Sequence, residues 1–457
     1  MALMSPVDSM FLLLEGREHP MHVGGLGLFV PPEGDNGQLA RSMYEDLVGV
    51  ERIRPLFRRK PQQLLSSFAS VSWAQDKDVD LEYHVRFAAL PRPGRVRELL
   101  ELTSRMHGTL LDRHRPLWEA TVIEGLADGR VAVYLKNHHA LVDGVSATRI
   151  MYRALPKQAN GEFVAPWAQL PSPTSRASSN GGFSPRGLLG ATARTVRDVA
   201  GIAPATLSSA YQAFNDEAAA LPFQAPKSMF NVPITGARRF AAQSWPLDRL
   251  RDVSRSAGVT VNDTVLAMSA GALRRYLLEQ DELPDQPLIA MVPVSLRSSD
   301  DSSNSKGNAV GAVLCNLGTE LSDPAARLLR IHNSMRHSKN VLSGLSPLQI
   351  MAVSVLNVAG IALGPLPGVD RLTGPPFNIV ISNVPGATEP RYWNGARMEN
   401  FFPASFPVDG QALNITVASY AGTMQFGLVG CRRSVPSLQR MLVHLEASLA
   451  ELEEATT

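Results

Sequence analysis

A short segment with two adjacent histidines joins a strand pattern to a helix pattern, and it constrains the fold more than any other part of the chain. Residues 131–138 alternate and are rich in β-branched and aromatic side chains, which predicts a β-strand. Residues 145–155 have a helical pattern, and Gly144 can make the tight turn between them. We therefore expect His138 and His139 at a strand end of an α/β protein, a common place for catalytic side chains.

Only one of the two histidines can face a given substrate, because successive strand side chains point to opposite faces. His139 continues the face of Leu135, and His138 continues the face of Lys136. We expect one histidine to do chemistry and the other to pack. We expect no metal site, since adjacent strand residues rarely ligate one ion. Asp143 could orient the loop or hold a cation. The plainer interpretation is a pair of core histidines beside a turn aspartate.

The run His138-His139-x-x-x-Asp143-Gly144 resembles the signature of the CoA-dependent acyltransferase superfamily. That group includes chloramphenicol acetyltransferase, carnitine acyltransferases and peptide-synthetase condensation domains. Further segments narrow the resemblance to the bacterial wax ester synthase/diacylglycerol acyltransferase family. In the expected order, they are residues 5–12, residues 20–26, Pro116-Leu117-Trp118, Asn262-Asp263 and Asn383-Val384-Pro385. Each motif is weak alone, but the ordered set is specific.

The resemblance implies that His139 is the general base. A neutral imidazole can take the hydroxyl proton of an alcohol as its oxygen attacks a thioester, and can then pass the proton to the departing CoA sulfur. A serine or cysteine nucleophile is not required, because the thioester is already activated. No Gly-x-Ser-x-Gly elbow accompanies the histidines, which disfavours a hydrolase. The predicted catalytic set is His139, His138, Asp143 and Asn262.

The same resemblance implies a structural role for Asp143. It implies that the Asp143 side chain turns away from the catalytic histidine and pairs with an arginine of the other half. Arg297, at the end of a predicted strand, is the best-placed partner in this sequence. Glu119 and Asp128 are rival partners for Arg297. Either charge would be costly if it were buried alone, so removing one should disrupt the site or the fold.

Asn262 begins a predicted helix and has two interpretations. It could lend its amide to the reacting carbonyl or position the alcohol, or it could make only a local hydrogen bond. Its neighbour Asp263 fits a capping box with Thr260, so we expect Asp263 to be structural. Trp118 and Gly144 are predicted to contact substrate, although a tryptophan that leads into a strand usually packs in a core.

Residues 340–369 carry no charged side chain, and residues 350–364 are mostly apolar. Gln349 and Asn357 argue against a membrane-spanning helix. A buried helix is the simpler interpretation. The functional one is the wall of an acyl or alcohol tunnel, or a patch that touches lipid. The small residues Gly360 and Ala362 would leave room for a substrate chain beside that helix.

The chain of 457 residues exceeds one ordinary core, so two domains are expected. We place them at residues 1–170 and 237–457, joined by a partly helical crossover linker at 171–236. The resemblance implies two chloramphenicol-acetyltransferase-like α/β sandwiches with an active-site tunnel at their interface. Further strands are predicted at 22–30, 118–124, 288–296 and 377–382, with a hairpin at 420–426. Helices are predicted at 37–50, 95–112, 247–257, 263–279, 324–341 and 436–454.

Charge and cysteine content limit the partners. A formal net charge of +2, with no long basic run, argues against nucleic acid. A CoA phosphate site needs only a few Lys or Arg residues, which composition does not locate. Cys315 and Cys431 suggest no disulfide framework and fit a reducing compartment. With no signal peptide expected, we predict a cytoplasmic protein, peripheral at the inner membrane or lipid droplets if it acts on lipids.

The resemblance implies an O-acyltransferase that moves a long-chain acyl group from acyl-CoA to a fatty alcohol or diacylglycerol. The products would be wax esters or triacylglycerols, with acyl-CoA as substrate and no cofactor. One alternative is a relative with another acceptor or with an acyl carrier protein as donor. Another is a non-catalytic lipid-binding relative, which the retention of His139 disfavours. The sequence ranks neither the acceptors nor the chain lengths.

Overall fold

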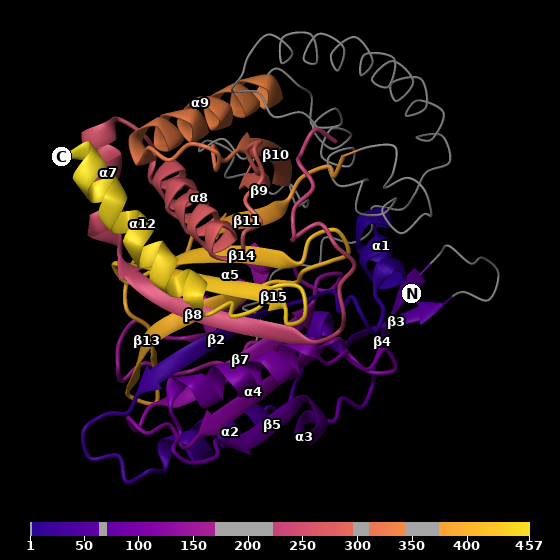
Figure 1. The fold of residues 1–457 in the computed structure, drawn as a ribbon. Coiled ribbons are helices and arrows are strands. Elements are labelled where there is room, and N and C mark those ends of the chain that lie inside the picture. The colour runs from indigo at the N-terminus through magenta and orange to yellow at the C-terminus, as the bar shows by residue number, and fades with distance from the viewer. Residues whose placement is uncertain (1, 64–70, 170–222, 296–309, 344–373) are drawn as a thin grey trace.

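The computed structural model describes residues 2–63, 71–169, 223–295, 310–343 and 374–457 of the chain (Figure 1). Two six-stranded sheets form its framework, and a three-stranded sheet lies near the N-terminus. Helices pack on both large sheets, so the chain folds into two α/β halves. This arrangement confirms the predicted α/β class.

The first sheet holds the histidine segment near its centre. In sheet order its strands are β12 (Tyr392–Trp393), β13 (Ala396–Ala404), β2 (His22–Val30), β7 (Val131–His138), β6 (Trp118–Glu124) and β5 (Val85–Ala89). Helices α2 (Leu39–Val48) and α5 (Gly144–Ala154) pack against one face, and α4 (Val96–Gly108) packs against the other. The predicted strands at 22–30, 118–124 and 131–138 are confirmed.

Shorter elements surround this sheet. They are α1 (Pro6–Leu14), η1 (Pro55–Arg58), α3 (Leu81–His84), β1 (Ala2–Leu3), β3 (Arg59–Gln63) and β4 (Val71–Gln75). Helix α1 was not expected from the sequence. Ser5 caps it by accepting a hydrogen bond from the Asp8 amide at 3.1 Å, with Pro6 at the first helical position.

The second sheet carries its helices on one side. In sheet order its strands are β10 (Val310–Asn316), β9 (Ile289–Ser295), β11 (Ile379–Val384), β14 (Leu413–Tyr420), β15 (Thr423–Cys431) and β8 (Arg238–Pro246). Its helices are α7 (Leu247–Ala257), α8 (Val261–Glu279), α9 (Pro324–Ser343) and α12 (Arg440–Thr456). Figure 1 shows α8, α9 and α12 gathered over this sheet, and one large apolar core joins them to it. All four helices agree with predicted ones to within a few residues at each end.

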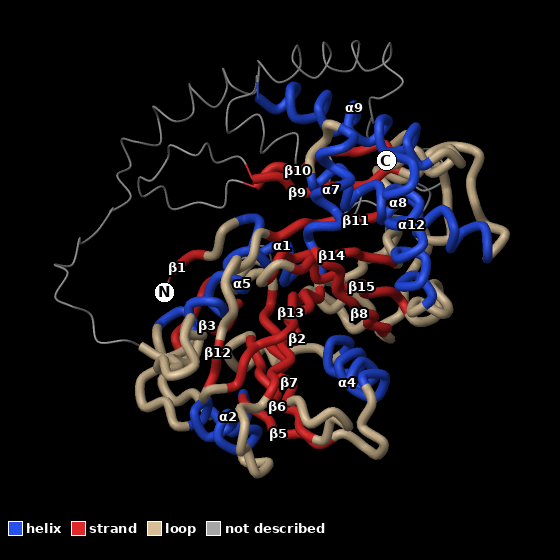
Figure 2. Tube along the Cα trace, turned by 90° about the vertical axis from the view of Figure 1, so that its left-hand side faces the viewer, coloured by secondary structure: helices blue, strands red, loops and turns tan. Residues whose placement is uncertain are grey.

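One strand from late in the chain belongs to the early sheet. After β11, the chain leaves the second sheet and pairs β13 antiparallel with β2, and it then returns as β14. Figure 2 shows β13 beside β2. The sheets therefore do not divide along the predicted domain boundaries, because this strand lies far beyond residue 237. A Cβ at Gly25 would collide with the Phe401 ring of β13, so this close pairing needs the glycine.

The predicted hairpin at 420–426 is confirmed as β14, a tight turn and β15. Ala421 and Gly422 both have positive φ, +43° and +82°, which suits a two-residue hairpin turn. None of the helices in the described ranges has the length and apolar content that crossing a bilayer requires. The predicted linker up to residue 222 and the apolar segment 350–364 lie outside the described residues.

Candidate active site

Strand β7 ends at His138, and α5 begins at Gly144, so the segment between them presents the motif as predicted. Asp143 is the N-cap of α5. Its carboxylate accepts hydrogen bonds from the Ser146 amide and the Ser146 hydroxyl, both at 2.8 Å. The cap fixes where the helix starts and thereby the shape of the loop that follows the histidines.

Gly144 does not make the tight turn that the sequence suggested. The turn is formed by residues 139–141, and Gly144 is already helical, without a positive φ. The N-cap bonds of Asp143 start the helix one residue earlier than expected, which is the physical reason for the difference. A Cβ at Gly144 would meet no atom within 4 Å, so space lies open in front of its backbone.

His138 is fully buried, and both of its ring nitrogens face protein groups. Nδ1 accepts a hydrogen bond from the Ala140 amide at 3.1 Å. Nε2 lies 3.2 Å from Oε1 of Glu15, whose side chain is also buried. With Nδ1 acting as acceptor, the ring proton sits on the buried Nε2, which lies at ion-pair distance from the carboxylate without an aligned hydrogen bond to it. His138 therefore has no nitrogen available for a substrate.

Glu15 is a site residue that the sequence analysis missed. Burial would raise the pKa of Glu15, but His138, the Met21 amide and Arg113 outweigh it and lower that pKa, so the carboxylate is charged. The Met21 amide donates to it at 3.1 Å, and Nη2 of Arg113 lies 3.0 Å away. Its only sequence signal is its place between the motifs at 5–12 and 20–26. Glu15 ties the end of α1 to the histidine segment.

His139 has different surroundings. The residue is of intermediate exposure, and its ring lies between two aromatic rings, Phe11 of α1 at 4.2 Å and Phe406 at 5.7 Å between ring centroids. Phe406 follows β13, so a residue from the late part of the chain borders this histidine. Burial lowers the pKa of His139 to about 4, against an opposing effect of Asp143. The imidazole is therefore neutral at physiological pH and able to accept a proton.

Asn262 lies in the first turn of α8 and contacts a second family motif. Its Oδ1 accepts a hydrogen bond from Nδ2 of Asn383 in β11 at 3.3 Å. This bond joins residues far apart in the sequence, so it is not the local bond that was the alternative. The predicted capping box is confirmed, because the Thr260 amide donates to Asp263 at 3.0 Å and the Asp263 amide donates to the Thr260 hydroxyl at 3.2 Å. No hydrogen bond joins Asn262 to His139 in the described part of the chain.

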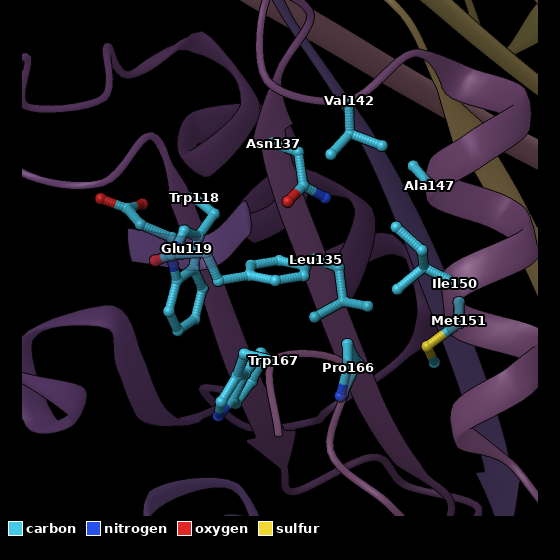
Figure 3. Close-up of a pocket in the computed structure, with 11 residues that line it drawn as sticks. Trp118, Glu119, Leu135, Asn137, Val142, Ala147, Ile150, Met151, Pro166 and Trp167 are labelled. Carbon is cyan, nitrogen blue, oxygen red and sulfur yellow. The ribbon is translucent and has the colours of Figure 1, made fainter. Parts of the chain in front are cut away.

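Trp118 is a buried core residue. Its ring stacks on Trp167 at 4.5 Å and on His84 at 4.4 Å, and its indole N–H donates to the Phe57 carbonyl at 2.9 Å. It also lines a small cavity beside β7 and α5, which Figure 3 shows with Leu135, Asn137, Val142 and Ala147 around it. The cavity volume of about 20 Å³ holds little more than one water molecule. In this structure Trp118 packs, and its predicted contact with substrate stays a prediction.

Three predicted site residues, Arg297, Gly360 and Ala362, lie outside the described residues. The pairing of Asp143 with Arg297 therefore stays a prediction, as does the tunnel between the halves. The rival carboxylates have other partners in the structure. Glu119 lies 2.9 Å from Arg86 and 3.0 Å from Lys136, and Asp128 lies 2.7 Å from Arg130. Neither needs a further arginine to balance its charge.

Two α/β halves, with a histidine pair between a strand and a capped helix, define the chloramphenicol-acetyltransferase-like class. Solved condensation domains share this fold at low sequence identity. The first condensation domain of the calcium-dependent antibiotic synthetase matches with a TM-score of 0.58 at 16% identity, covering 100% of this chain and 96% of that one. At that identity the likeness concerns the fold alone.

Two family models and two close relatives identify the family. The wax ester synthase/diacylglycerol acyltransferase catalytic domain matches residues 4–265, and the WS/DGAT C-terminal domain matches residues 306–453. The "Probable diacyglycerol O-acyltransferase tgs2" of Mycobacterium tuberculosis is 55% identical over 456 residues, covering 100% of this chain and 99% of that protein. The wax ester synthase/diacylglycerol acyltransferase from Marinobacter aquaeolei VT8 matches with a TM-score of 0.79 at 40% identity, covering 100% of both chains.

The chain belongs to the wax ester synthase/diacylglycerol acyltransferase family and is an acyl-CoA-dependent O-acyltransferase. The resemblance drawn from its motifs is thereby confirmed, together with the predicted fold class.

Proposed function

We propose that this enzyme transfers a long-chain acyl group from acyl-CoA to the hydroxyl of a diacylglycerol or a fatty alcohol, with His139 as general base. The observation that carries the proposal is the contrast between the two histidines. Both nitrogens of His138 lie against protein groups, whereas His139 is neutral, partly exposed and bordered by Phe11 and by Phe406 from the late part of the chain. The relatives' names support these two acceptors. The name of the Mycobacterium tuberculosis protein includes diacylglycerol O-acyltransferase, and the name of the Marinobacter aquaeolei protein includes both wax ester synthase and diacylglycerol acyltransferase.

The chemistry follows from the ring of His139. Its neutral imidazole has one unprotonated ring nitrogen. That nitrogen takes the acceptor's hydroxyl proton as the oxygen attacks the thioester carbon. The tetrahedral intermediate then breaks its C–S bond, the CoA sulfur receives the proton, and the new ester leaves.

We assign Asn262 a role in positioning the reacting groups. Asn383 donates to its Oδ1, so its amide plane is oriented and its Nδ2 group points away from that bond. Nδ2 has no hydrogen-bond partner among the described residues. An oriented, unused N–H donor suits the oxyanion of the intermediate or the acceptor oxygen.

Asp143 and Arg297 form the proposed ion pair between the halves. Asp143 already anchors the start of α5, so a charge opposite it would hold the catalytic loop to the other half. In the charge-swapped variant Asp143→Arg/Arg297→Asp, part of the stability lost in each single variant should return. Melting curves that show no recovery would rule out this partner.

We also propose that the enzyme meets its substrates at a lipid surface, as a peripheral protein of the inner membrane or of lipid droplets. The support is chemical, since diacylglycerols and fatty alcohols reside in such surfaces. Sedimentation with vesicles that contain diacylglycerol should pull down the enzyme. An enzyme that stays in the supernatant and still acylates vesicle-bound acceptor would contradict the idea.

The test of the function uses palmitoyl-CoA with a diacylglycerol or hexadecanol as acceptor. Wild type should release thiol and form ester, and His139→Ala should be slower by a factor of about 10² to 10⁴, the usual contribution of positioned proton transfer. His114→Ala is the matched control, because His114 is exposed and belongs to no motif. An unchanged rate in a folded His139→Ala enzyme would remove His139 as the base. Product analysis with both acceptors present decides which one is preferred.

A further inference from the structure

A basic groove runs along α5, from Val145 just after the histidine motif to the residues that follow the helix. Its volume is about 480 Å³, and its walls are α5, the residues that follow α5, and the loop after β11. Four of the side chains that line it are cationic and none is acidic. They are Arg149, Arg153, Lys157 and Arg391, of which Lys157 lies 2.5 Å from the exposed carboxylate of Glu389.

The two arginines of α5 have no local compensation. Arg149 and Arg153 are four residues apart, so they share one face of the helix, and both are exposed. Neither has a carboxylate within ion-pair distance among the described residues. Two like charges at this spacing weaken a helix slightly, which no neighbouring acid offsets. The pKa of Arg54 is lowered, first by burial and then by the positive charge of Arg153. Arg153 thus acts on its neighbour as an uncompensated positive charge does.

Two buried polar groups in the groove also lack partners. The hydroxyl of Tyr152 is buried and has no hydrogen-bond partner in the described part of the chain, and the Tyr152 side chain lines the groove. Nε of Arg391 is also buried and has no hydrogen-bond partner among the described residues. Burial raises the pKa of Tyr152, so its hydroxyl keeps its proton and remains a donor. Buried donors without acceptors are rare in folded proteins, and an anionic ligand would satisfy both.

The groove is connected to the catalytic residues by two elements. Helix α5 begins next to Asp143, and at a rise of about 1.5 Å per residue Arg149 and Arg153 lie about 9 and about 15 Å along its axis from that residue. Near the end of β11, Asn383 contacts Asn262, and Pro385 in the loop that follows lines the groove two residues later. An anion held by these two arginines would therefore lie about 9 to about 15 Å along α5 from Asp143, on elements that also carry catalytic residues.

We propose that this groove binds the phosphate groups of the CoA donor. CoA is the substrate whose anionic end is separated from the reacting carbonyl by a long flexible arm, which fits cationic side chains set apart from the histidine. Guanidinium groups suit phosphates because they donate two parallel hydrogen bonds and stay charged. The assignment rests on the proposed acyl-CoA donor and names the side chains that recognise it.

The experiment compares Arg149→Ala, Arg153→Ala and the double variant with two donors, palmitoyl-CoA and S-palmitoyl-pantetheine, which lacks the nucleotide and its phosphates. Hydrogen bonds to charged groups predict a rise of about 10-fold or more in KM for palmitoyl-CoA per arginine, with kcat nearly unchanged. With S-palmitoyl-pantetheine, the variants should equal wild type. Arg105→Ala is the matched control, because Arg105 is an exposed helical arginine outside the groove.

Three results would each count against the CoA assignment. An unchanged KM for palmitoyl-CoA in the double variant would overturn the assignment, as would an equal loss with S-palmitoyl-pantetheine. Loss of binding to anionic vesicles, with KM for palmitoyl-CoA preserved, would assign the groove to lipid headgroups instead. Calorimetric titration with free CoA separates this proposal from the proposed function. A wild-type enzyme that binds CoA through these arginines without transferring acyl groups would keep the site and reject the function. Circular dichroism confirms that each variant is folded.

Discussion

The two halves of the molecule place their charges differently. Beside β7, the charged groups are inside: Glu15 faces His138, and Lys136, which is 1% exposed, lies 3.0 Å from Glu119. In the second half, the helices that cover the sheet meet through an apolar core, and most of their ion pairs lie at the surface; the buried Asp263 of α8, 2.9 Å from His332 of α9, is an exception. Arg249 of α7, for example, lies 2.7 Å from Glu453 of α12, with about a third of each side chain exposed.

This difference indicates that the first half accepts a cost in stability around its catalytic residues. Removing charges from water is expensive, and a buried pair often contributes less than well-packed apolar residues would. The first half keeps such pairs around the strand that carries the histidines. The second half is built as a scaffold, with apolar burial as its main stabilising term. We expect substitutions in the two halves to separate accordingly.

The largest expected effect is at Glu15. Glu15→Ala leaves His138 and Arg113 facing an empty buried site, so the free energy of unfolding should fall by about 3–5 kcal/mol. Activity should fall as well, because the end of α1 no longer holds the histidine segment. Denaturant unfolding and ester formation measure the two effects. Glu15→Gln should lose less of both, since it keeps an acceptor for the Met21 amide. Glu18→Ala, at an exposed neighbour, is the control. A silent Glu15→Ala would show that the buried pair has no special role.

Substitutions in the apolar core of the second half should change stability without changing activity. Leu273 of α8 is fully buried in the apolar core, so Leu273→Ala should lower the free energy of unfolding by about 2–5 kcal/mol. Below its melting temperature the variant should keep kcat and KM near wild-type values. Leu278→Ala tests the same substitution at a position on the same helix that is 53% exposed, and it should change little. A large fall in kcat for folded Leu273→Ala would mean that the scaffold shapes the site directly.

The smallest effect is expected at the surface pairs. Arg249→Ala removes contacts to Glu446 and Glu453, yet exposed ion pairs typically contribute about 0–1 kcal/mol. Added salt should shrink even that difference, because it screens exposed charges. Melting temperatures of wild type and variant at low and high salt measure it. A loss as large as that of Glu15→Ala would erase the contrast between buried and surface charge.

Local pattern was a good guide to individual elements. Strand β7 follows from alternation and helix α5 from a helical pattern, each to within a few residues of its observed bounds. The opposite environments of His138 and His139 follow from the two-residue period of a strand. The capping box at Thr260 and the hairpin at Ala421 are also local, so the sequence was enough to predict them. Gly144 was misjudged because a helix cap and a glycine turn compete for the same loop.

Contacts between distant residues were not predictable in this way. Glu15 meets His138 because α1 folds back against the end of β7, and no spacing in the sequence records that approach. Strand β13 joins the first sheet, although its sequence neighbours lie in the second. The groove likewise combines a helix face with a loop from the other half. Periodicity tells which side of an element is buried, not which partner buries it.

The sequence alone was enough to predict a histidine motif on a strand-to-helix connection, an α/β fold and membership in an acyltransferase family. Those properties are local patterns, or ordered sets of local patterns. The tertiary structure alone decided that His138 is enclosed by Glu15, that His139 lies between Phe11 and Phe406, and that four cations line one groove. The reason is physical: burial, pairing and uncompensated charge depend on which distant segments the whole fold brings together.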